Sequence, residues 1–351
     1  MKILIDVGHP AQVHYYSALY KFLKDDHSFI FTCRDQQIVA DLLKYYGIPY
    51  IVIGEKGTGL KQKALKQLNF TKTLHNLIKS HEIDLAFGVS SVLASKGSKA
   101  KSIVFCDDDR EAIKLISKTI LPFADTIISP DSLSHEGSPK TVYYPGSHEL
   151  SYLHPNRYQP DPVVLQNYGL REEEVYFILR LTAFKAYHDH GNHGLTTVQK
   201  KDLVERLSQY GRVYITSETP IDGEFEKYRI PVKVHEMHSF LAYASMLVSD
   251  SQTMTSEAAV LGVPSFRCNT FAGRLSVLEE EEKRYGLTVG FKPWQFNWMI
   301  DAITKHLQRR ADRTEWYMKR DMFIRDKIDV TPFWASLIND YPKSIDKLLK
   351  T

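Results

Sequence analysis

The chain has 351 residues, of which 43% are hydrophobic and 25% are charged, as in an ordinary globular protein. Its 45 basic and 42 acidic residues leave a net charge of +3, and without a polybasic run this balance gives no electrostatic support to nucleic-acid binding. No uninterrupted apolar run reaches about 18 residues, so we predict no membrane-spanning helix, and the length predicts two domains.

Short apolar runs alternate with amphipathic runs over the first half of the chain. The first strand is predicted at residues 2–7, after which Val13, Tyr16, Leu19 and Leu23 recur at helical spacing. The other strands of this half are predicted at residues 28–33, 50–53, 84–88, 102–106 and 125–129. Repeated β-α-β units of this kind predict a parallel sheet with helices on both faces.

The alternation breaks at residues 151–168, where Pro155, Pro160 and Pro162 indicate a linker. It then restarts, with strands predicted at residues 175–181, 212–216, 232–234, 245–250 and 264–268. Helices are predicted at residues 196–211 and 252–262 and in the tail from residue 312 onward. We therefore predict an α/β protein of two Rossmann-like domains, residues 1–150 and 169–330, facing each other across a cleft. Residues 331–351 are predicted to form a final helix that packs back on the first domain.

Cys33, Cys106 and Cys268 lie far apart, each in or beside an apolar, strand-like run. This pattern is typical of buried thiols in a reducing compartment rather than of disulfides or a zinc ribbon. The opening MKILIDV is interrupted too early for a signal peptide. We therefore expect a cytoplasmic protein.

The stretch DVGHPAQVHYY, residues 6–16, runs from the first strand into the first helix. Gly8 permits a tight turn and Pro10 suits the first helical position. His9 and His14 then lie near the helix start, where the ends of parallel strands form ligand sites. His9 is a candidate general base or polar clamp, and the alternative is a capping or solvated histidine. Because Gly8 stands alone, the G-x-G-x-x-G fingerprint is incomplete and a nicotinamide dehydrogenase is not expected.

The segment SDSQTMTSEAAVLGVPSFRC, residues 249–268, resembles the donor-nucleotide segment of GT-B-fold enzymes. These include bacterial UDP-N-acetylglucosamine 2-epimerases, in which Asp-Ser-Gly-Gly precedes two glutamates, an alanine and Gly-x-Pro. The matching positions are Asp250, Ser251, Glu257, Ala258, Gly262 and Pro264. Gln252 and Thr253 replace the glycines, and Ser256 replaces the first glutamate.

The resemblance implies that Glu257 binds ribose hydroxyls and that Ser251, with the N–H groups of Gln252 and Thr253, meets the phosphates. A helix N-terminus attracts such an anion because its first N–H groups lack intrahelical acceptors. The alternative is an ordinary amphipathic helix capped by Ser251.

Two further segments are similar to parts of the same enzymes. In VYFILRLTAFKAYHDHG, residues 175–191, the resemblance implies that Arg180 and Lys185 neutralise a diphosphate and that His188 acts on the sugar. In SIVFCDDDREA, residues 102–112, it implies a catalytic acid at Asp107 or Asp108. A solvated acidic loop is the alternative for the second segment.

The whole chain resembles the DUF354 family of archaeal and bacterial proteins of undefined function. The resemblance rests on ILIDVGHPAQVHYY, FGVSSVLAS and YYPGSHELSYLHP, and it implies a GT-B-like fold without a defined reaction. In the third segment, Gly146, His148 and Glu149 are expected either to shape a hinge at the end of the first domain or to contact the sugar.

The segment HDHGNHG, residues 188–194, offers a rival interpretation. His188, His190 and His193 have the H-x-H-x-x-H spacing of metallo-β-lactamase-fold hydrolases, in which imidazoles share zinc. Asn192 stands where that family has an aspartate, and the downstream candidates His235 and His238 lack convincing flanking residues. A third class is a non-catalytic nucleotide-sugar-binding scaffold, suggested by Gln252 and Thr253.

We predict a GT-B-type glycosyltransferase-like enzyme that uses a nucleotide-diphosphate sugar, with a UDP-sugar expected first, in surface polysaccharide or glycoconjugate synthesis. The alternatives are a nucleotide-sugar 2-epimerase, a zinc metallohydrolase and a non-catalytic scaffold. No metal or other cofactor and no nucleic-acid partner are expected, and the acceptor is open. The candidate catalytic residues are His9, Asp107 and His188. The candidate nucleotide-sugar ligands are Gly8, Arg180, Lys185, Ser251, Gln252, Thr253 and Glu257.

Overall fold

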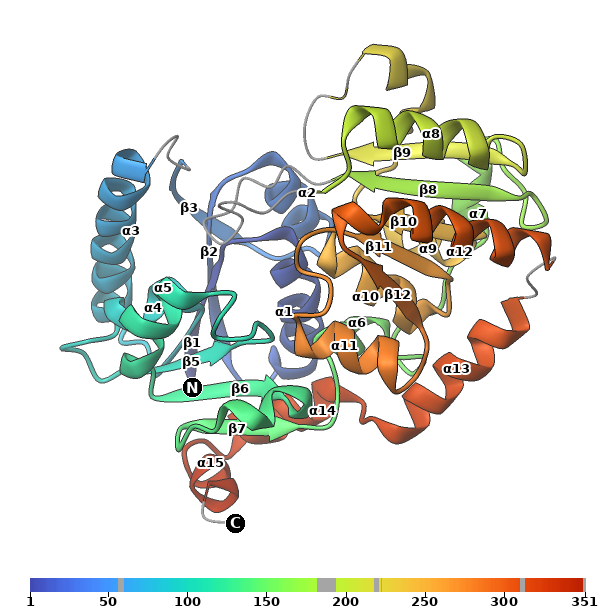
Figure 1. The fold of residues 1–351 in the computed structure, drawn as a ribbon. Coiled ribbons are helices and arrows are strands. Elements are labelled where there is room, and N and C mark those ends of the chain that lie inside the picture. Colours follow the sequence, from blue (N-terminus) through green and yellow to red (C-terminus); the bar gives the residue numbers. More distant parts are fainter. Residues whose placement is uncertain (56–59, 182–193, 218–220, 222, 310–312, 350–351) are drawn as a thin grey trace. The chain divides into compact units, whose positions relative to one another are not determined.

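A computed structural model describes the chain except for residues 56–59, 182–193, 218–220, 222, 310–312 and 350–351, and it leaves the side chains of residues 60–64 undescribed (Figure 1). The chain divides into two compact units. Unit 1 comprises Met1–Tyr152 and Ile328–Thr351, and unit 2 comprises Leu153–Lys327. The predicted linker, residues 151–168, therefore falls almost entirely within unit 2.

The sheet of unit 1 contains seven parallel strands in the order β3-β2-β1-β4-β5-β6-β7. The strands are β1 (Lys2–Val7), β2 (Ser28–Asp35), β3 (Tyr50–Glu55), β4 (Leu85–Phe87), β5 (Lys101–Phe105), β6 (Thr126–Pro130) and β7 (Thr141–Tyr144). The chain runs outward from β1 to β3 and then returns to β4 on the other side of β1. The strand order therefore reverses between β1 and β4, the position where open parallel sheets bind ligands.

The helices of unit 1 cover both faces of this sheet. They are α1 (Pro10–Leu23), α2 (Gln37–Tyr45), α3 (Leu60–Ser80), α4 (Val89–Ala94), α5 (Lys114–Thr119), α14 (Val330–Asn339) and α15 (Lys343–Leu348), with the 3-10 turns η1 (Leu121–Phe123) and η2 (Asp131–Glu136). Because crossovers between parallel strands are right-handed, α1 and α2 cover one face and α3, α4 and α5 cover the other. A short helix, α6 (Leu150–Leu153), spans the boundary between the units.

The end of the chain returns to unit 1. Helix α14 packs against α1, and Trp334 is fully buried there, with its ring centroid 4.4 Å from that of Phe105 and 6.0 Å from that of Tyr15. Thr331 anchors the same helix because its Oγ1 donates to the carbonyl oxygen of Ser151 at 2.7 Å. The final helices thus complete the hydrophobic core of the first unit.

The sheet of unit 2 contains five parallel strands in the order β12-β11-β10-β8-β9. The strands are β8 (Tyr176–Leu181), β9 (Arg212–Ser217), β10 (Met246–Ser249), β11 (Ser265–Cys268) and β12 (Thr288–Phe291). The helices are α7 (Val163–Gln166), α8 (Thr197–Leu207), α9 (Met237–Ala242), α10 (Gln252–Leu261), α11 (Ser276–Lys283), α12 (Phe296–Gln308) and α13 (Arg313–Asp326), with the 3-10 turns η4 (Gly223–Tyr228) and η5 (Pro293–Gln295). A cluster of buried apolar side chains, among them Phe177, Val248 and Met299, fills the space between sheet and helices.

The predicted α/β class is confirmed, with two parallel sheets and interleaved helices. The strand predicted at residues 232–234 is wrong, because these residues are irregular. Pro231 supplies no N–H donor at the start of this segment, and the N–H of Lys233 donates to the Tyr168 hydroxyl rather than to a strand. Strands β7 and β12 were not predicted. Within the described residues, no helix is long and apolar enough to cross a membrane.

Candidate functional site

The first candidate region is the turn that joins β1 to α1. His9 is the N-cap of α1, and its Nδ1 accepts from the N–H of Ala11 at 3.2 Å. The Gln12 side chain reaches back, and its Oε1 accepts from the N–H groups of Gly8 and His9 at 2.7 and 3.2 Å. This reciprocal arrangement is a capping box. His9 therefore has a structural role at the helix start while its ring stays exposed.

Gly8, in the turn that joins β1 to α1, has an ordinary backbone conformation. Its φ lies outside the left-handed region, and a Cβ atom there would meet only Gln12 Oε1 at 3.6 Å and Arg34 Nη1 at 3.8 Å. The backbone at Gly8 therefore does not itself demand a glycine. The neighbouring turn after β4 is the demanding one, since Gly88 has a φ of 106° and a Cβ there would lie 2.7 Å from the carbonyl oxygen of Asp6.

A buried ion pair fixes the sheet beneath the His9 turn. Arg34 Nη1 lies 2.7 Å from both carboxylate oxygens of Asp6, and Thr32 Oγ1 donates to the same carboxylate at 2.9 Å. Arg34 Nη2 also donates to Ser90 Oγ at 2.6 Å, at the start of α4. Strands β1 and β2 and the start of α4 are thereby held together at the reversal of strand order. Sequence reasoning missed this network because its members are widely spaced along the chain.

An acid–base arrangement in unit 1 joins Asp107, after β5, to His148, after β7. His148 Nδ1 lies 3.3 Å from Asp107 Oδ2, and the histidine side chain is only 4% exposed whereas the aspartate side chain is 41% exposed. Rings of Tyr15, Tyr144 and Trp334 enclose the imidazole, with centroids 5.1, 6.4 and 5.4 Å away. This enclosure orients the histidine, which in turn holds an accessible carboxylate.

The two partners shift each other's protonation. Burial alone disfavours both charged forms, but the charge and hydrogen bond of His148 lower the pKa of Asp107, and His9 adds to this effect. The Asp107 carboxylate raises the pKa of His148 in the same way, against the effect of its burial. Asp107 is therefore stabilised as a carboxylate, the form required of a general base.

Asp108 behaves in the opposite way. Its side chain is accessible at the mouth of a small pocket, yet desolvation by the surrounding protein and the charge of Asp107 raise its pKa to about 7. Two adjacent carboxyl groups with separated pKa values are the arrangement by which enzymes obtain an acid and a base from one residue type.

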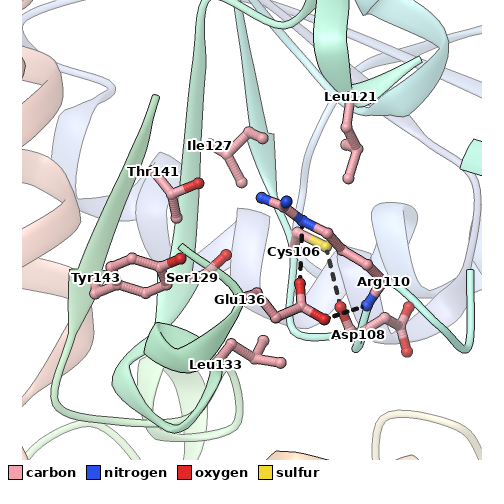
Figure 2. Close-up of a pocket in the computed structure, with 10 residues that line it drawn as sticks. All are labelled: Cys106, Asp108, Arg110, Leu121, Ile127, Ser129, Leu133, Glu136, Thr141 and Tyr143. Carbon is pink, nitrogen blue, oxygen red and sulfur yellow. Dashed lines mark hydrogen bonds and ion pairs between the residues drawn. The ribbon is translucent and has the colours of Figure 1, made fainter. Parts of the chain in front are cut away.

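Figure 2 shows this pocket, which extends from Cys106 and Asp108 to Tyr143. Arg110 and Glu136 face each other in it, with Arg110 Nε 3.1 Å from Glu136 Oε2 and the N–H of Arg110 donating to Glu136 Oε1 at 2.6 Å. Burial raises the pKa of the Cys106 thiol, which therefore stays protonated at neutral pH. The pocket thus contains no activated sulfur nucleophile.

Asp109, His135 and Glu136 bring potential ligand atoms within 4.8 Å of one another beside this pocket. Glu136 already binds the Arg110 guanidinium. The positive charge that a cation would supply at this carboxylate is therefore provided by the protein.

The second candidate region, in unit 2, is the start of α10. Ser251 is the N-cap, and its Oγ accepts from the N–H of Met254 at 3.4 Å. The N–H of Ser251 donates to Ser249 Oγ at 2.8 Å, and the carbonyl oxygen of Asp250 accepts from Asn269 Nδ2 at 2.8 Å. These bonds fix the turn that leads into the helix. The first two helical residues are Gln252 and Thr253, whose N–H groups have no intrahelical acceptor.

Arg180 lies beside this turn. It is the partner of Ser249 in the parallel pairing of β8 with β10, and its carbonyl oxygen accepts from the N–H of Asp250 at 3.3 Å. The backbone of Arg180 therefore adjoins the residues that lead into α10. Lys185 and His188, with the rest of HDHGNHG up to His193, lie outside the described residues.

Glu257 lies farther along α10 and is buried. His238 Nε2, from α9, is 2.9 Å from Glu257 Oε1, and each side chain is 7% exposed. The sequence offered His238 as a downstream metal ligand, whereas the structure pairs it with the predicted ribose ligand. At the preceding position, Ser256 Oγ donates to Glu281 Oε1 of α11 at 2.5 Å. A carboxylate from a different helix therefore contacts the position where the similar enzymes have their first glutamate.

The structure thus gathers the predicted residues into two groups. Gly8, His9 and Asp107 belong to the loops after β1 and β5 in unit 1, together with His148, which was only an open alternative. Arg180, Ser251, Gln252, Thr253 and Glu257 belong to β8 and α10 in unit 2, together with His238. A histidine facing a carboxylate occurs in both groups, and neither pair is visible in local sequence spacing.

The profile of the family described as "Protein of unknown function (DUF354)" matches residues 1–279. The chain belongs to the DUF354 family. This DUF354 chain is also 24% identical to the uncharacterized protein MJ0665 of Methanocaldococcus jannaschii over 294 residues, which is 76% of this chain and 82% of that protein. The predicted membership is confirmed.

Solved structures share the fold of this DUF354 protein. The S. aureus MnaA–UDP structure matches with a TM-score of 0.69 at 13% identity, covering 100% of this chain and 98% of that one. UDP-N-acetylglucosamine 2-epimerase from Rickettsia bellii matches with a TM-score of 0.69 at 16% identity, covering 99% and 98%. A glycosyltransferase from Rickettsia africae matches with a TM-score of 0.56 at 14% identity, covering 98% of each chain. At these identities the likeness establishes the fold, which is of the GT-B type.

Proposed function

We propose that the protein is an enzyme that acts on a nucleotide-diphosphate sugar, with glycosyl transfer as the first candidate reaction. The observation that carries the proposal is the start of α10, where a fixed Ser251 cap, two helical N–H groups and Arg180 come together. The proposal is supported by a fold whose similar structures include a glycosyltransferase and a protein solved with UDP. On this basis a UDP-sugar is the first substrate to test.

The proposal assigns nucleotide binding to unit 2. The N–H groups of Gln252 and Thr253, with Arg180, offer donors and positive charge to a diphosphate. The Glu257 carboxylate is a suitable acceptor for ribose hydroxyls, and His238 fixes its orientation through the 2.9 Å contact. Lys185 and His188 remain predicted contributors from the neighbouring segment.

The proposal assigns acid–base chemistry to unit 1. Glycosyl transfer needs a base that removes the proton of an acceptor hydroxyl, and Asp107 is held as a carboxylate by His148. The charge and the hydrogen bond of His148 stabilise the Asp107 carboxylate before it takes this proton. His9 contributes to the same electrostatic field. The leaving diphosphate is stabilised by the donors at the start of α10, so the reaction requires no metal ion.

A nucleotide-sugar 2-epimerase is the second candidate, favoured by the carboxyl pair. Epimerisation uses an acid and a base together, and Asp107 is held ionised while the pKa of Asp108 is raised to about 7. The zinc metallohydrolase has no comparable support, since its histidine segment lies outside the described residues and the fold is of the GT-B type. The non-catalytic scaffold remains the outcome if nucleotide binds without turnover.

We further propose a reducing, cytoplasmic location and a role in polysaccharide or glycoconjugate synthesis. The location is supported by the free cysteines, of which Cys33 and Cys268 are buried. The role in synthesis follows from the proposed reaction, because glycosyl transfer adds a sugar to a growing polysaccharide or glycoconjugate.

The test is a panel of UDP-, GDP-, CDP- and dTDP-sugars, first as additives in thermal unfolding and then as substrates followed by NMR. At least one sugar nucleotide is expected to raise the unfolding temperature. Release of free nucleotide only when an acceptor is added identifies a transferase, and an isomerised sugar still attached to its nucleotide identifies an epimerase. The absence of any shift with all four classes contradicts the proposal.

A further inference from the structure

The helical layer on one face of unit 1 has an unusual charge pattern. Among the residues whose side chains the structure describes, helices α3, α4 and α5 with η1 contain five lysines and no aspartate or glutamate. The lysines are Lys66, Lys72, Lys79, Lys114 and Lys118. Helices α1 and α2 on the opposite face contain two lysines, Lys21 and Lys44, and one aspartate, Asp41. The positive charge is therefore concentrated on one side of the sheet, although the chain as a whole is nearly neutral.

The same layer exposes large apolar side chains. On α3, Leu65 and Leu68 are 63% and 68% exposed, and their spacing of three residues places them on one stripe with Lys72. The opposite side of this helix buries Leu74 and Ile78 against the sheet. Figure 1 shows α3, α4 and α5 gathered beside one another along that sheet. The exposed apolar residues on the other elements of the layer are Leu93, Leu115 and Phe123.

We propose that this layer, which we call the α3 face, binds the surface of an anionic lipid bilayer. A peripheral helix needs apolar side chains that enter the interface and lysines that meet the lipid phosphates, and the α3 face exposes both. Two of its described lysines form ion pairs with acidic residues just outside these elements, Lys66 with Glu55 and Lys114 with Glu111, each at 3.4 Å. A nucleic-acid surface would use the charge but would gain nothing from exposed leucines.

The experiment is flotation of the full-length protein with vesicles. Binding is expected to vesicles of phosphatidylcholine mixed with phosphatidylglycerol and to be lost with phosphatidylcholine alone or in about 1 M salt, where the Debye length is about 3 Å. The double variant Leu65→Gln/Leu68→Gln removes only exposed side chains, and it should lose binding while keeping its thermal unfolding temperature. Phe22→Gln on α1, where Phe22 is 48% exposed, is the matched control and should bind as the parent does.

The charge contribution is tested by Lys72→Gln/Lys118→Gln, with Lys44→Gln on α2 as the control. The double variant should weaken partition onto anionic vesicles by roughly tenfold to thirtyfold, and Lys44→Gln should not. Equal binding to neutral vesicles, or full binding by the leucine variant, overturns the proposal. Tighter binding to duplex DNA or RNA than to vesicles, unaffected by the leucine variant, also overturns it. Because the test needs no sugar nucleotide, its outcome is independent of the proposed reaction.

Discussion

The two strand-to-helix turns that carry the candidate residues use their helix N-termini differently. At the start of α1, the side chains of His9 and Gln12 occupy the amides of Gly8, His9 and Ala11. At the start of α10, the cap is the small hydroxyl of Ser251, whose bond to the N–H of Met254 is 3.4 Å long. The same β-α turn is therefore closed by its own side chains in unit 1 and offers donors to a ligand in unit 2. This difference is the reason why our proposal places phosphate binding at α10 and acid–base chemistry in the loops of unit 1.

The largest expected effect comes from Asp107→Asn. The amide is close in shape but cannot accept a proton, so turnover should fall by about 10²- to 10⁴-fold, the usual contribution of a positioned base. Stabilisation by the sugar nucleotide should remain, since the binding donors belong to unit 2. Rates and thermal shifts measured on the same preparation check this division. Loss of both properties together would contradict it.

The next effect concerns nucleotide binding through Glu257. Glu257→Gln keeps the shape of the side chain but removes the charge that accepts ribose hydroxyls, and affinity should fall by about 10- to 100-fold, the value of hydrogen bonds to a charged group. The matched control is Glu281→Gln, a second buried glutamate that contacts α10 through Ser256. Calorimetric titration of both variants should show the loss only for Glu257. Equal losses would mean that Glu257 acts only by shaping the helix.

The pH dependence of stability tests the Asp107–His148 pair. The raised pKa of His148 stabilises the fold below its ordinary value of about 6.5 and is lost as pH rises through the folded-state value. The raised pKa of Asp108 acts in the same direction between its ordinary value of about 3.9 and about 7. The lowered pKa of Asp107 contributes above its ordinary value of about 3.9 and is lost at lower pH. The unfolding temperature should therefore decline as pH rises from about 4 to about 7 because of Asp108, and above about 6.5 because of His148.

The decline should be flatter in Asp107→Asn, because this change removes the charge that raises both other pKa values. Thermal scans of parent and variant over this range provide the comparison. An identical slope in both proteins would show that the pair does not govern this titration.

The smallest expected effect is on stability, and it comes from removing the capping side chain at either helix start, α1 or α10. Ser251→Ala and His9→Ala each remove a capping acceptor, and each should lower the free energy of unfolding by about 1 kcal/mol. Only Ser251→Ala should also weaken binding of a nucleoside diphosphate. Chemical denaturation gives the first quantity and calorimetric titration the second. Weaker nucleotide binding by His9→Ala with no change in Ser251→Ala would reverse the assignment.

Much of the fold was predictable because apolar runs and amphipathic runs alternate so regularly. The exceptions have physical reasons. Strand β7 is the short TVYY followed by Pro145 and Gly146, which reads as a turn, and β12 is the four-residue TVGF, in which a glycine lowers strand propensity. Pairing with β6 and β11 stabilises these strands, and such long-range contacts leave no local pattern.

The sequence indicated the candidate residues that follow strand ends, but it did not indicate the side chains that pair with them. Asp107, Ser251 and Glu257 follow from resemblance and from their positions after strands. The partners of two of them, His148 and His238, come from other elements, and His148 depends on an aromatic enclosure that includes Trp334 near the end of the chain. Local spacing carries no information on such pairs, because only the folded sheet brings them together.

The most direct measurement of the central claim is a calorimetric titration of the parent protein with UDP and with uridine. If the start of α10 holds a diphosphate, UDP should bind and uridine should bind far more weakly, and Ser251→Ala should reduce this difference. GDP, CDP and dTDP then extend the comparison to other bases. Uridine binding as tightly as UDP, or no binding by any nucleoside diphosphate, would contradict the account.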